Sequence, residues 1–274
     1  GRKAVMMALT AFISAYEQAP ADNRSAEYSK IVEVAELMED RFEDHENVDL
    51  VRMHVARLHQ MHSATIDAAT WYARVQPGSP DYVRSRLLAG QAYWSGYLKA
   101  TNERSSEDEL VSPQVTDWKS RADTLLGEGI KAAADNLNLR ENVVLGKFTL
   151  GQMAVRDRRF AAAVDFLTAE PLAVTTAVEK APTGGRPDSG IHSVPFAKLV
   201  YTTLLQALIG TNQLNEALVA VQTLQTIVGD DNAAFVARLH FELSQELMSA
   251  YLVSVKAGEP NVDMPKSIAS SLEQ

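Results

Sequence analysis

Residues 54–94 read HVARLHQMHSATIDAATWYARVQPGSPDYVRSRLLAGQAYW, and this stretch decides the fold. Two small residues, Ala56 and Gly90, are separated by 34 positions, and each lies in an apolar segment with helical spacing. A period of 34 residues is typical of a repeated helix-turn-helix unit. Because one such unit cannot bury its own apolar face, neighbouring units must stack, and the stack forms a curved helical surface. The stretch therefore favours a surface built to hold a partner.

Helical periodicity extends on both sides of this stretch. Apolar side chains such as Val5, Leu9 and Phe12 recur at steps of three and four residues, and no convincing alternation typical of strands occurs. We therefore predict an all-α protein. The expected helices span residues 2–18, 25–43, 48–62, 64–76, 80–100, 115–137, 141–157, 159–169, 195–210, 213–228 and 232–256.

Serine, proline and glycine mark the helix boundaries. Serine–proline pairs at 79–80 and 112–113 indicate helix starts, because serine caps the first turn and proline needs no donor there. Gly210 and Gly229 come at the end of apolar periodic runs and indicate helix ends. These signals delimit the helices on either side of them.

Three segments depart from the helical pattern. Residues 102–112 are polar, and residues 174–193 hold a dense cluster of turn formers. We interpret both as insertions in one helical domain over 1–257, whose best-matching repeats span 48–228. Residues 258–274 contain two prolines and end in mostly small or polar residues, which is typical of a tail or linker.

The first two units resemble the tetratricopeptide repeat family. Ala56 takes the small position of a first helix, Ala68 that of the second helix, Tyr72 the large packing position, and Pro80 the closing proline. Gly90 then opens the next unit. The resemblance implies a right-handed superhelical stack of antiparallel helix pairs, an α-solenoid.

Two later segments match the same pattern. Gly151 takes the close-contact position and Ala163 the small position of the second helix, while Ala217 matches Ala163 in the last unit. Leu205 replaces the small residue of that last unit, so no unit carries the full motif. Small residues allow paired helices to cross closely, and a bulky side chain would hold them apart. We therefore expect tight helix packing around Gly90.

In proteins of this family, the first helix of each repeat lines a concave groove. The groove-facing positions carried over to this chain are His54, Arg57, Gln60, Arg84, Gln91, Trp94, Gln152, Arg156, Lys198, Tyr201 and Gln206. None is acidic, although acidic residues outnumber basic ones in the chain. The resemblance thus implies a mildly basic, amide-rich groove that suits an extended protein or peptide partner, acidic or carboxylate-ended.

Composition excludes several classes of function. The chain has 274 residues, of which 46% are apolar and 22% charged, as expected of a folded protein. The formal net charge of −9 disfavours nonspecific nucleic-acid binding, which depends on basic side chains. The absence of cysteine excludes disulfides, thiolate zinc sites and cysteine nucleophiles. No apolar run is long enough to predict a membrane span.

The sequence begins Gly1-Arg2-Lys3 without a methionine, so we expect a fragment or a processed product. A signal segment could have been removed, and the sequence therefore does not fix the compartment. Both a cytoplasmic and an exported protein fit it. The oligomeric state is equally open.

Histidines are the residues that could hold a metal ion. His59 and His62 share a helix face, but His54 is five residues from His59, about 140° around the helix. A zinc site needs three or four ligands that converge, and no His-Glu-x-x-His motif occurs. We interpret these histidines as packing residues and expect no metal or cofactor.

Two further clusters have polar residues of a functional kind. The acidic run from Glu36 to Asp49 could bind cations or a basic partner, although such runs are usually solvated helix faces. Asp188, Ser189 and His192 are the residue types of a hydrolase triad, but the Gly-x-Ser-x-Gly motif is absent. We interpret the second cluster as loop composition and predict no catalysis.

Aromatic pairs occur at 71–72 and 93–94. Adjacent residues of a helix point about 100° apart, so we expect one member of each pair in the core. Tyr72 and Tyr93 fit that role, whereas Trp94 fits it less well.

The leading hypothesis is a noncatalytic scaffold for protein–protein interaction. The first alternative is an all-helical enzyme, or a metal- or ligand-binding protein, that uses His59 and His62 or the loop 182–193. The second alternative is a purely architectural segment of a larger protein.

Overall fold

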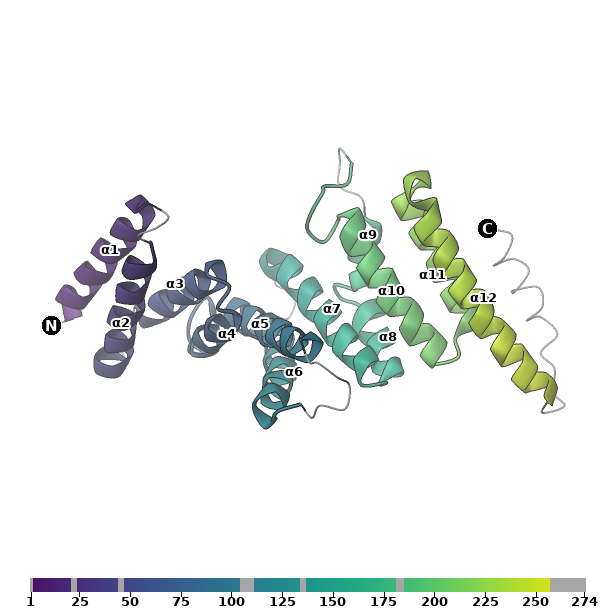
Figure 1. Ribbon diagram of the computed structural model, residues 1–274, viewed down its shortest axis with the longest axis horizontal. Helices are drawn as coiled ribbons and strands as arrows, with labels where there is room; N and C mark the ends of the chain where they lie inside the picture. Colours follow the sequence, from purple (N-terminus) through teal and green to yellow (C-terminus); the bar gives the residue numbers. More distant parts are fainter. Residues whose placement is uncertain are drawn as a thin grey trace. The chain divides into compact units, whose positions relative to one another are not determined.

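The computed structural model describes residues 2–20, 24–43, 47–103, 111–133, 137–180 and 185–256. The described residues form helices and no strand (Figure 1), which confirms the predicted all-α class. The α-helices are α1 (Arg2–Gln18), α2 (Arg24–Phe42), α3 (Val48–Met61), α4 (Thr65–Ala73), α5 (Tyr82–Asn102), α6 (Pro113–Ala133), α7 (Arg140–Arg156), α8 (Phe160–Thr168), α9 (Val174–Glu179), α10 (Val194–Gly210), α11 (Leu214–Val228) and α12 (Ala233–Lys256). Short 3₁₀ turns are η2 (Leu137–Leu139) and η3 (Asp230–Asn232).

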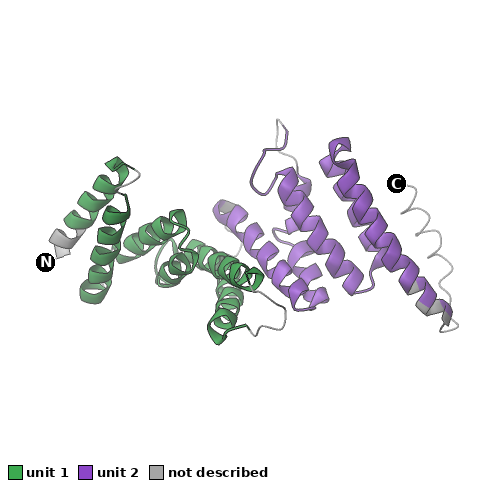
Figure 2. Ribbon diagram, viewed as in Figure 1, with its two compact units in different colours: residues 1–134 green, residues 135–274 purple. Residues whose placement is uncertain are grey.

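The chain divides into two compact units, unit 1 (residues 1–134) and unit 2 (residues 135–274), shown in Figure 2. In unit 1, α1 pairs with α2, α3 with α4, and α5 with α6, and α2–α3 and α4–α5 contacts join the pairs. In unit 2, α7 pairs with α8 and α10 with α11. Contacts between α8 and α10 join the two pairs, and α12 packs against α11. Helices that follow one another in sequence therefore pack in antiparallel pairs, as predicted. The single domain over 1–257 stays a prediction, and the tail 258–274 lies outside the described residues.

Two of the predicted close-contact glycines lie where helices touch. A Cβ atom added at Gly90 would lie 2.5 Å from Cγ of Leu126 and 3.1 Å from the carbonyl oxygen of Ala122, across the α5–α6 interface. A Cβ atom at Gly151 would lie 3.0 Å from Cδ2 of Leu167 in α8. The absence of a side chain lets each helix approach its partner this closely, which confirms the expected tight packing around Gly90.

The aromatic pairs correct one expectation. Trp71, Tyr72, Tyr93 and Trp94 are all buried, so neither pair divides between core and surface. The cause is that α4 packs on both α3 and α5, and α5 packs on both α4 and α6. A helix in the interior of a stack has two covered faces, and residues about 100° apart can both be buried.

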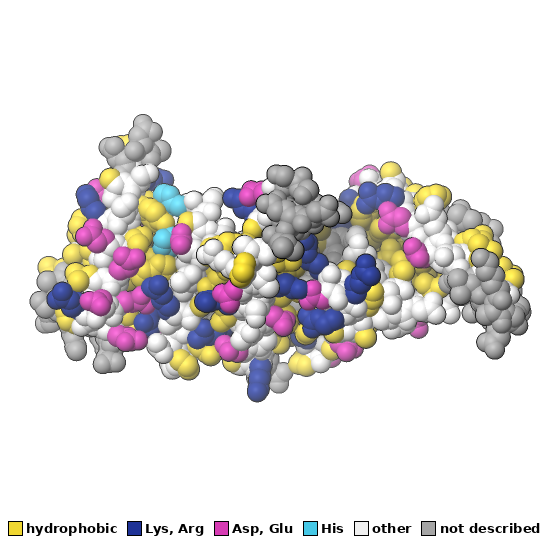
Figure 3. Space-filling model, turned by 60° about the horizontal axis from the view of Figure 1, so that its bottom comes forward, with side chains coloured by type: hydrophobic (Ala, Val, Ile, Leu, Met, Phe, Trp, Pro, Cys, Tyr) yellow, Lys and Arg dark blue, Asp and Glu magenta, His cyan; other side chains and the backbone are white. Residues whose placement is uncertain are grey.

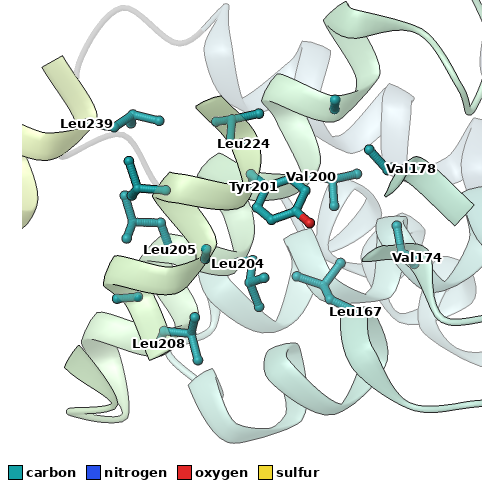
Figure 4. Close-up of a cluster of buried hydrophobic side chains, with 14 of the residues drawn as sticks. Leu167, Val174, Val178, Val200, Tyr201, Leu204, Leu205, Leu208, Leu224 and Leu239 are labelled. Carbon is teal, nitrogen blue, oxygen red and sulfur yellow. The ribbon is translucent and has the colours of Figure 1, made fainter. Parts of the chain in front are cut away.

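Six described helices, α7 to α12, contribute side chains to the core of unit 2, and Figure 4 shows its centre around Tyr201 of α10. Val174 and Val178 come from α9, a helix that the sequence analysis assigned to an irregular insertion. Burial of the apolar side chains at 174, 177 and 178 stabilises this six-residue helix. Among the described residues that follow, Arg186 donates to the carbonyl oxygens of Val178 and His192 at 2.7 and 3.2 Å and so connects the segment after residue 184 to α9.

Helix ends follow the predicted signals with two differences. Ser112 Oγ accepts the N–H of Val115 at 3.2 Å and so caps α6, as predicted. Gly229 ends α11 with φ +68°, a conformation that glycine adopts without strain. Helix α5 begins at Tyr82, later than expected. Gly210 is the last residue of α10 rather than a stop beyond it, and a Cβ there would lie 2.3 Å from the ring of Phe160.

Candidate binding face on α3 and α5

Predicted groove residues of unit 1 gather around the hydroxyl group of Tyr72. That hydroxyl donates a hydrogen bond to Gln60 Oε1 at 3.2 Å. Burial raises the pKa of Tyr72, and the positive charges of Arg57 and Arg84 act in the opposite direction. Arg57 and Gln60 on α3 and Arg84 on α5 are exposed. Two helices that the sequence analysis assigned to successive repeats therefore present their basic residues together.

We call this surface the α3–α5 face. It comprises His54, Arg57 and Gln60 on α3 and Arg84, Gln91 and Trp94 on α5. Arg84 and Gln91 are seven residues apart and so point within about 20° of each other on the helix. Burial lowers the pKa of His54, and the neighbouring charge of Arg57 lowers it further. Neutral His54 thus adds no positive charge near neutral pH.

The α3–α5 face holds hydrogen-bond donors that lack acceptors. The side-chain nitrogens of Gln91 and Trp94 are buried, and neither finds a partner in the described part of the chain. A buried donor without a partner costs roughly 1–3 kcal/mol. Trp94 is only 5% exposed and stacks on Tyr97 at a centroid distance of 5.2 Å. Its ring therefore belongs to the core, which corrects its predicted place on an open groove.

In unit 2 the predicted groove residues have different surroundings. Tyr201 is 3% exposed and donates to Glu179 Oε1 at 2.7 Å, and burial raises the pKa of its hydroxyl. The ammonium group of Lys198 bonds to Asn232 and lies over a neighbouring phenylalanine ring. Packing within unit 2 thus engages both side chains, and Tyr201 is buried whereas Lys198 is half-buried. Gln152 is half-buried, and Arg156 and Gln206 are exposed.

The histidines pair with tyrosines. The Tyr28 hydroxyl lies 2.5 Å from His59 Nδ1, and the Tyr16 hydroxyl lies 3.0 Å from His62 Nε2. Tyr28 also stacks on His62 at a centroid distance of 4.1 Å. Figure 3 shows histidine at the surface near the amino-terminal end of unit 1. These contacts connect α1 and α2 to α3, so the interpretation of both histidines as packing residues fits their positions.

The first alternative, an enzyme or a metal-binding protein, needs either a set of metal ligands or a catalytic triad. No group of three or more His, Asp or Glu side chains is placed to hold a metal ion within those residues. Asp188 and Ser189 are exposed, and no hydrogen bond joins either of them to His192 in the described part of the loop. None of the helices described is long and apolar enough to cross a membrane.

Because the pKa of His59 is lowered, we predict that the free energy of unfolding depends on pH. The side chain is 6% exposed, and its burial lowers the pKa, an effect that Asp67 and Glu36 oppose and that His62 and Arg74 reinforce. An unfolded histidine takes up its proton near pH 6.5, whereas the folded one does so at lower pH. The unfolded state thus binds more protons in that interval, and the free energy of unfolding should fall as pH decreases below about 7.

Urea unfolding followed by tryptophan fluorescence tests this, because all three tryptophans lie in unit 1. Between about pH 7.5 and 5.5, the variant His59→Gln should lose stability less steeply than the wild type. Tyr28→Phe removes the hydroxyl bonded to His59 but keeps the titrating ring, so its slope should stay close to that of the wild type. Equal slopes for all three proteins would contradict the prediction.

From the sequence, the acidic run was expected to be a solvated helix face. The structure differs, because two of its carboxylates pair with arginines. Arg52 is buried, and it donates from Nε to Glu39 at 2.7 Å and from Nη1 to Asp49 at 2.9 Å. Arg74 also pairs with Glu39. The sequence offered a signal, since Arg52 interrupts the apolar stripe of α3 and acidic residues flank it. Residues 44 and 46 of the run lie outside the described residues.

Comparison of the chain with protein-family models, with curated proteins and with solved structures finds no match. The residues of the α3–α5 face and the pairing of the helices are therefore the features from which we infer function.

Proposed function

We propose that this protein is a noncatalytic interaction scaffold whose helix pairs are tetratricopeptide-like repeats in a right-handed superhelical stack. Its α3–α5 face binds an extended peptide that is acidic or ends in a carboxylate. One observation carries the proposal: two exposed arginines from different helices, Arg57 on α3 and Arg84 on α5, act together on the Tyr72 hydroxyl. Both are cationic donors at the surface, whereas the side-chain nitrogens of Gln91 and Trp94 are buried below it.

The chemistry of such a ligand follows from these donors. Guanidinium groups form strong, charge-assisted hydrogen bonds with carboxylates. Peptide carbonyl oxygens are the acceptors that the exposed amide group of Gln60 can use. A ligand that carries both along an extended backbone would satisfy Arg57, Arg84 and Gln60 together. No residue of the face is itself acidic.

A labelled peptide tests the proposal. A fluorescein-labelled peptide rich in glutamate, with a free carboxyl terminus, should bind the protein and raise its fluorescence anisotropy. Replacing Arg57 and Arg84 together with glutamate should weaken binding by about tenfold or more, equivalent to about 1.4 kcal/mol. Binding by the wild type should also weaken with salt, since about 8 Å is the reach of surface charges at physiological ionic strength.

Two controls separate a site from general attraction. Arg121 and Arg238 are exposed and paired with Asp117 and Glu242, and their joint replacement with glutamate changes the net charge equally. That variant should bind as the wild type does. Equal losses in the two variants would contradict the proposal. A charge reversal at Glu36 that weakens the same peptide would instead place its site on α2.

A further inference from the structure

A second surface of unit 1 lies on α2 and has the opposite charge. On one side of α2, a cavity of about 550 Å³ has an apolar part formed by Phe12 from α1 and by Val34 and Leu37 from α2. Lys30 also lines it, and its ammonium group is paired with Glu27 at 3.0 Å. Leu37 is 44% exposed within the cavity. Cavities of this size with a largely apolar lining are typical of sites that take up a ligand group.

On the other side of α2, a cavity of about 580 Å³ lies against α3, the end of α4 and α5. Its arginines are engaged within the protein: Arg52 and Arg74 bond to Glu39, and Arg86 donates to the carbonyl oxygen of Ala73 at 2.7 Å. Both cavities share Glu36 and Asp40 in their walls. The acidic ridge between them is thus bordered by a hollow on each side.

The ridge consists of Glu33, Glu36 and Asp40, which recur at three- and four-residue steps and so share one face of α2, and of Glu43, which directly follows the helix. Glu33 and Glu36 form no ion pair with any described residue. Among the described residues, Asp40 forms an ion pair with the adjacent, exposed Arg41 alone, at 3.5 Å, and Glu43 is 4.0 Å from Arg52. Like charges at these steps repel each other, and within the described residues little neutralises them. Figure 3 shows acidic side chains among hydrophobic ones at this end of unit 1.

We propose that this ridge and the apolar cavity beside it form a second docking surface, for a basic amphipathic segment of a partner protein. Apolar side chains of that segment occupy the cavity between α1 and α2, and its lysine or arginine side chains meet Glu33, Glu36 and Asp40. Charge complementarity selects this occupant, because an acidic or neutral segment would leave the repulsion along the ridge in place. The proposal does not depend on the α3–α5 face, since it uses other residues and an opposite charge.

A designed peptide of about 18 residues, helical and with a leucine face and a lysine face, probes this surface. Fluorescence anisotropy should show that it binds at least about tenfold more tightly than the same peptide with glutamate for lysine. A peptide with serine for leucine should bind more weakly than the first one, because the cavity then stays empty. Salt should weaken binding of the lysine peptide, as expected for charges at the rim of an interface.

Matched variants locate the site. The joint replacement of Glu33 and Glu36 with lysine should weaken the lysine peptide by about tenfold, and Leu37→Ser should weaken it without a change in net charge. Glu103 and Asp123 are exposed elsewhere in unit 1, and their joint replacement with lysine should leave binding unchanged. Circular dichroism of each variant checks that the helices persist.

Two results would overturn the proposal. The first is an equal loss of peptide affinity in the ridge variant and in the Glu103 and Asp123 variant. Binding would then be explained by the overall charge of −9 rather than by the ridge. The second is self-association of the protein alone, seen by sedimentation equilibrium and abolished by the ridge variant, which would make a second copy the occupant. Neither result bears on the glutamate peptide and the α3–α5 face.

Discussion

Replacing Gly90 with leucine is expected to lower the free energy of unfolding of unit 1 by about 3 kcal/mol, at the upper end of the usual cost of overpacking. Even a Cβ atom there would lie 2.5 Å from Cγ of Leu126, and the carbonyl oxygen of Ala122 is 3.1 Å away. The carbonyl belongs to the backbone of α6 and cannot rotate aside. The two helices must therefore separate. Urea unfolding followed by tryptophan fluorescence measures the loss in unit 1.

Gly127 provides a matched control for Gly90. It lies in α6, and a Cβ atom added there meets no atom within 4 Å in the described structure. Gly127→Leu replaces a poor helix former with a good one on an exposed face, so it should raise stability by up to about 1 kcal/mol. The same substitution thus acts in opposite directions at two glycines. Equal effects at both would show that Gly90 is not at a close helix crossing.

Replacing Arg52 with methionine should cost about 3 kcal/mol, because removing one partner leaves buried charges without compensation. The Arg52 side chain is 4% exposed, while those of Glu39 and Asp49 are 16% and 17% exposed. Methionine keeps most of the side-chain volume, so a loss of packing contributes little. Glu39 would keep its pairing with Arg74, whereas Asp49 would lose its ion pair with Arg52. Tryptophan fluorescence again reports the stability of unit 1.

Arg121→Met is the control for Arg52→Met, because it removes a solvent-exposed ion pair. Arg121 and Asp117 are four residues apart on α6, 2.6 Å from each other, and about half exposed. Solvent screens such pairs, which contribute about 0.5 kcal/mol or less. A loss at Arg52 as small as the loss at Arg121 would mean that the Arg52 cluster adds little to the stability of unit 1. The connection between α2 and α3 would then rest on apolar packing.

Local sequence patterns located most helices. Periodic apolar residues and caps such as Ser112 act within one or two turns, so a single segment contains the information. Helix α9 was not predicted, because its six residues are too few to show a helical period and turn formers follow them directly. The tight packing at Gly90 and Gly151 was also predicted, since the repeat spacing placed both at helix crossings.

The candidate site could be predicted only in part. Arg57, Gln60 and Arg84 are exposed near one another, as the repeat register implied. Trp94 and Tyr201 share that register but are buried, because a neighbouring helix covers them. The register of one helix fixes the direction of a side chain, whereas the packing of other helices decides whether that direction ends in solvent.

The sequence by itself determined the helical class, the order of the helix pairs and the close contact at Gly90, because these depend on periodicity and on residue size. The tertiary structure alone decided which polar groups find partners. Arg52 meets Glu39 across two helices, whereas the indole N–H of Trp94 has no acceptor among the described residues. It also decided that the ridge from Glu33 to Glu43 lies between two cavities. Burial and pairing depend on the positions of several helices together, and no single segment of the sequence contains those positions.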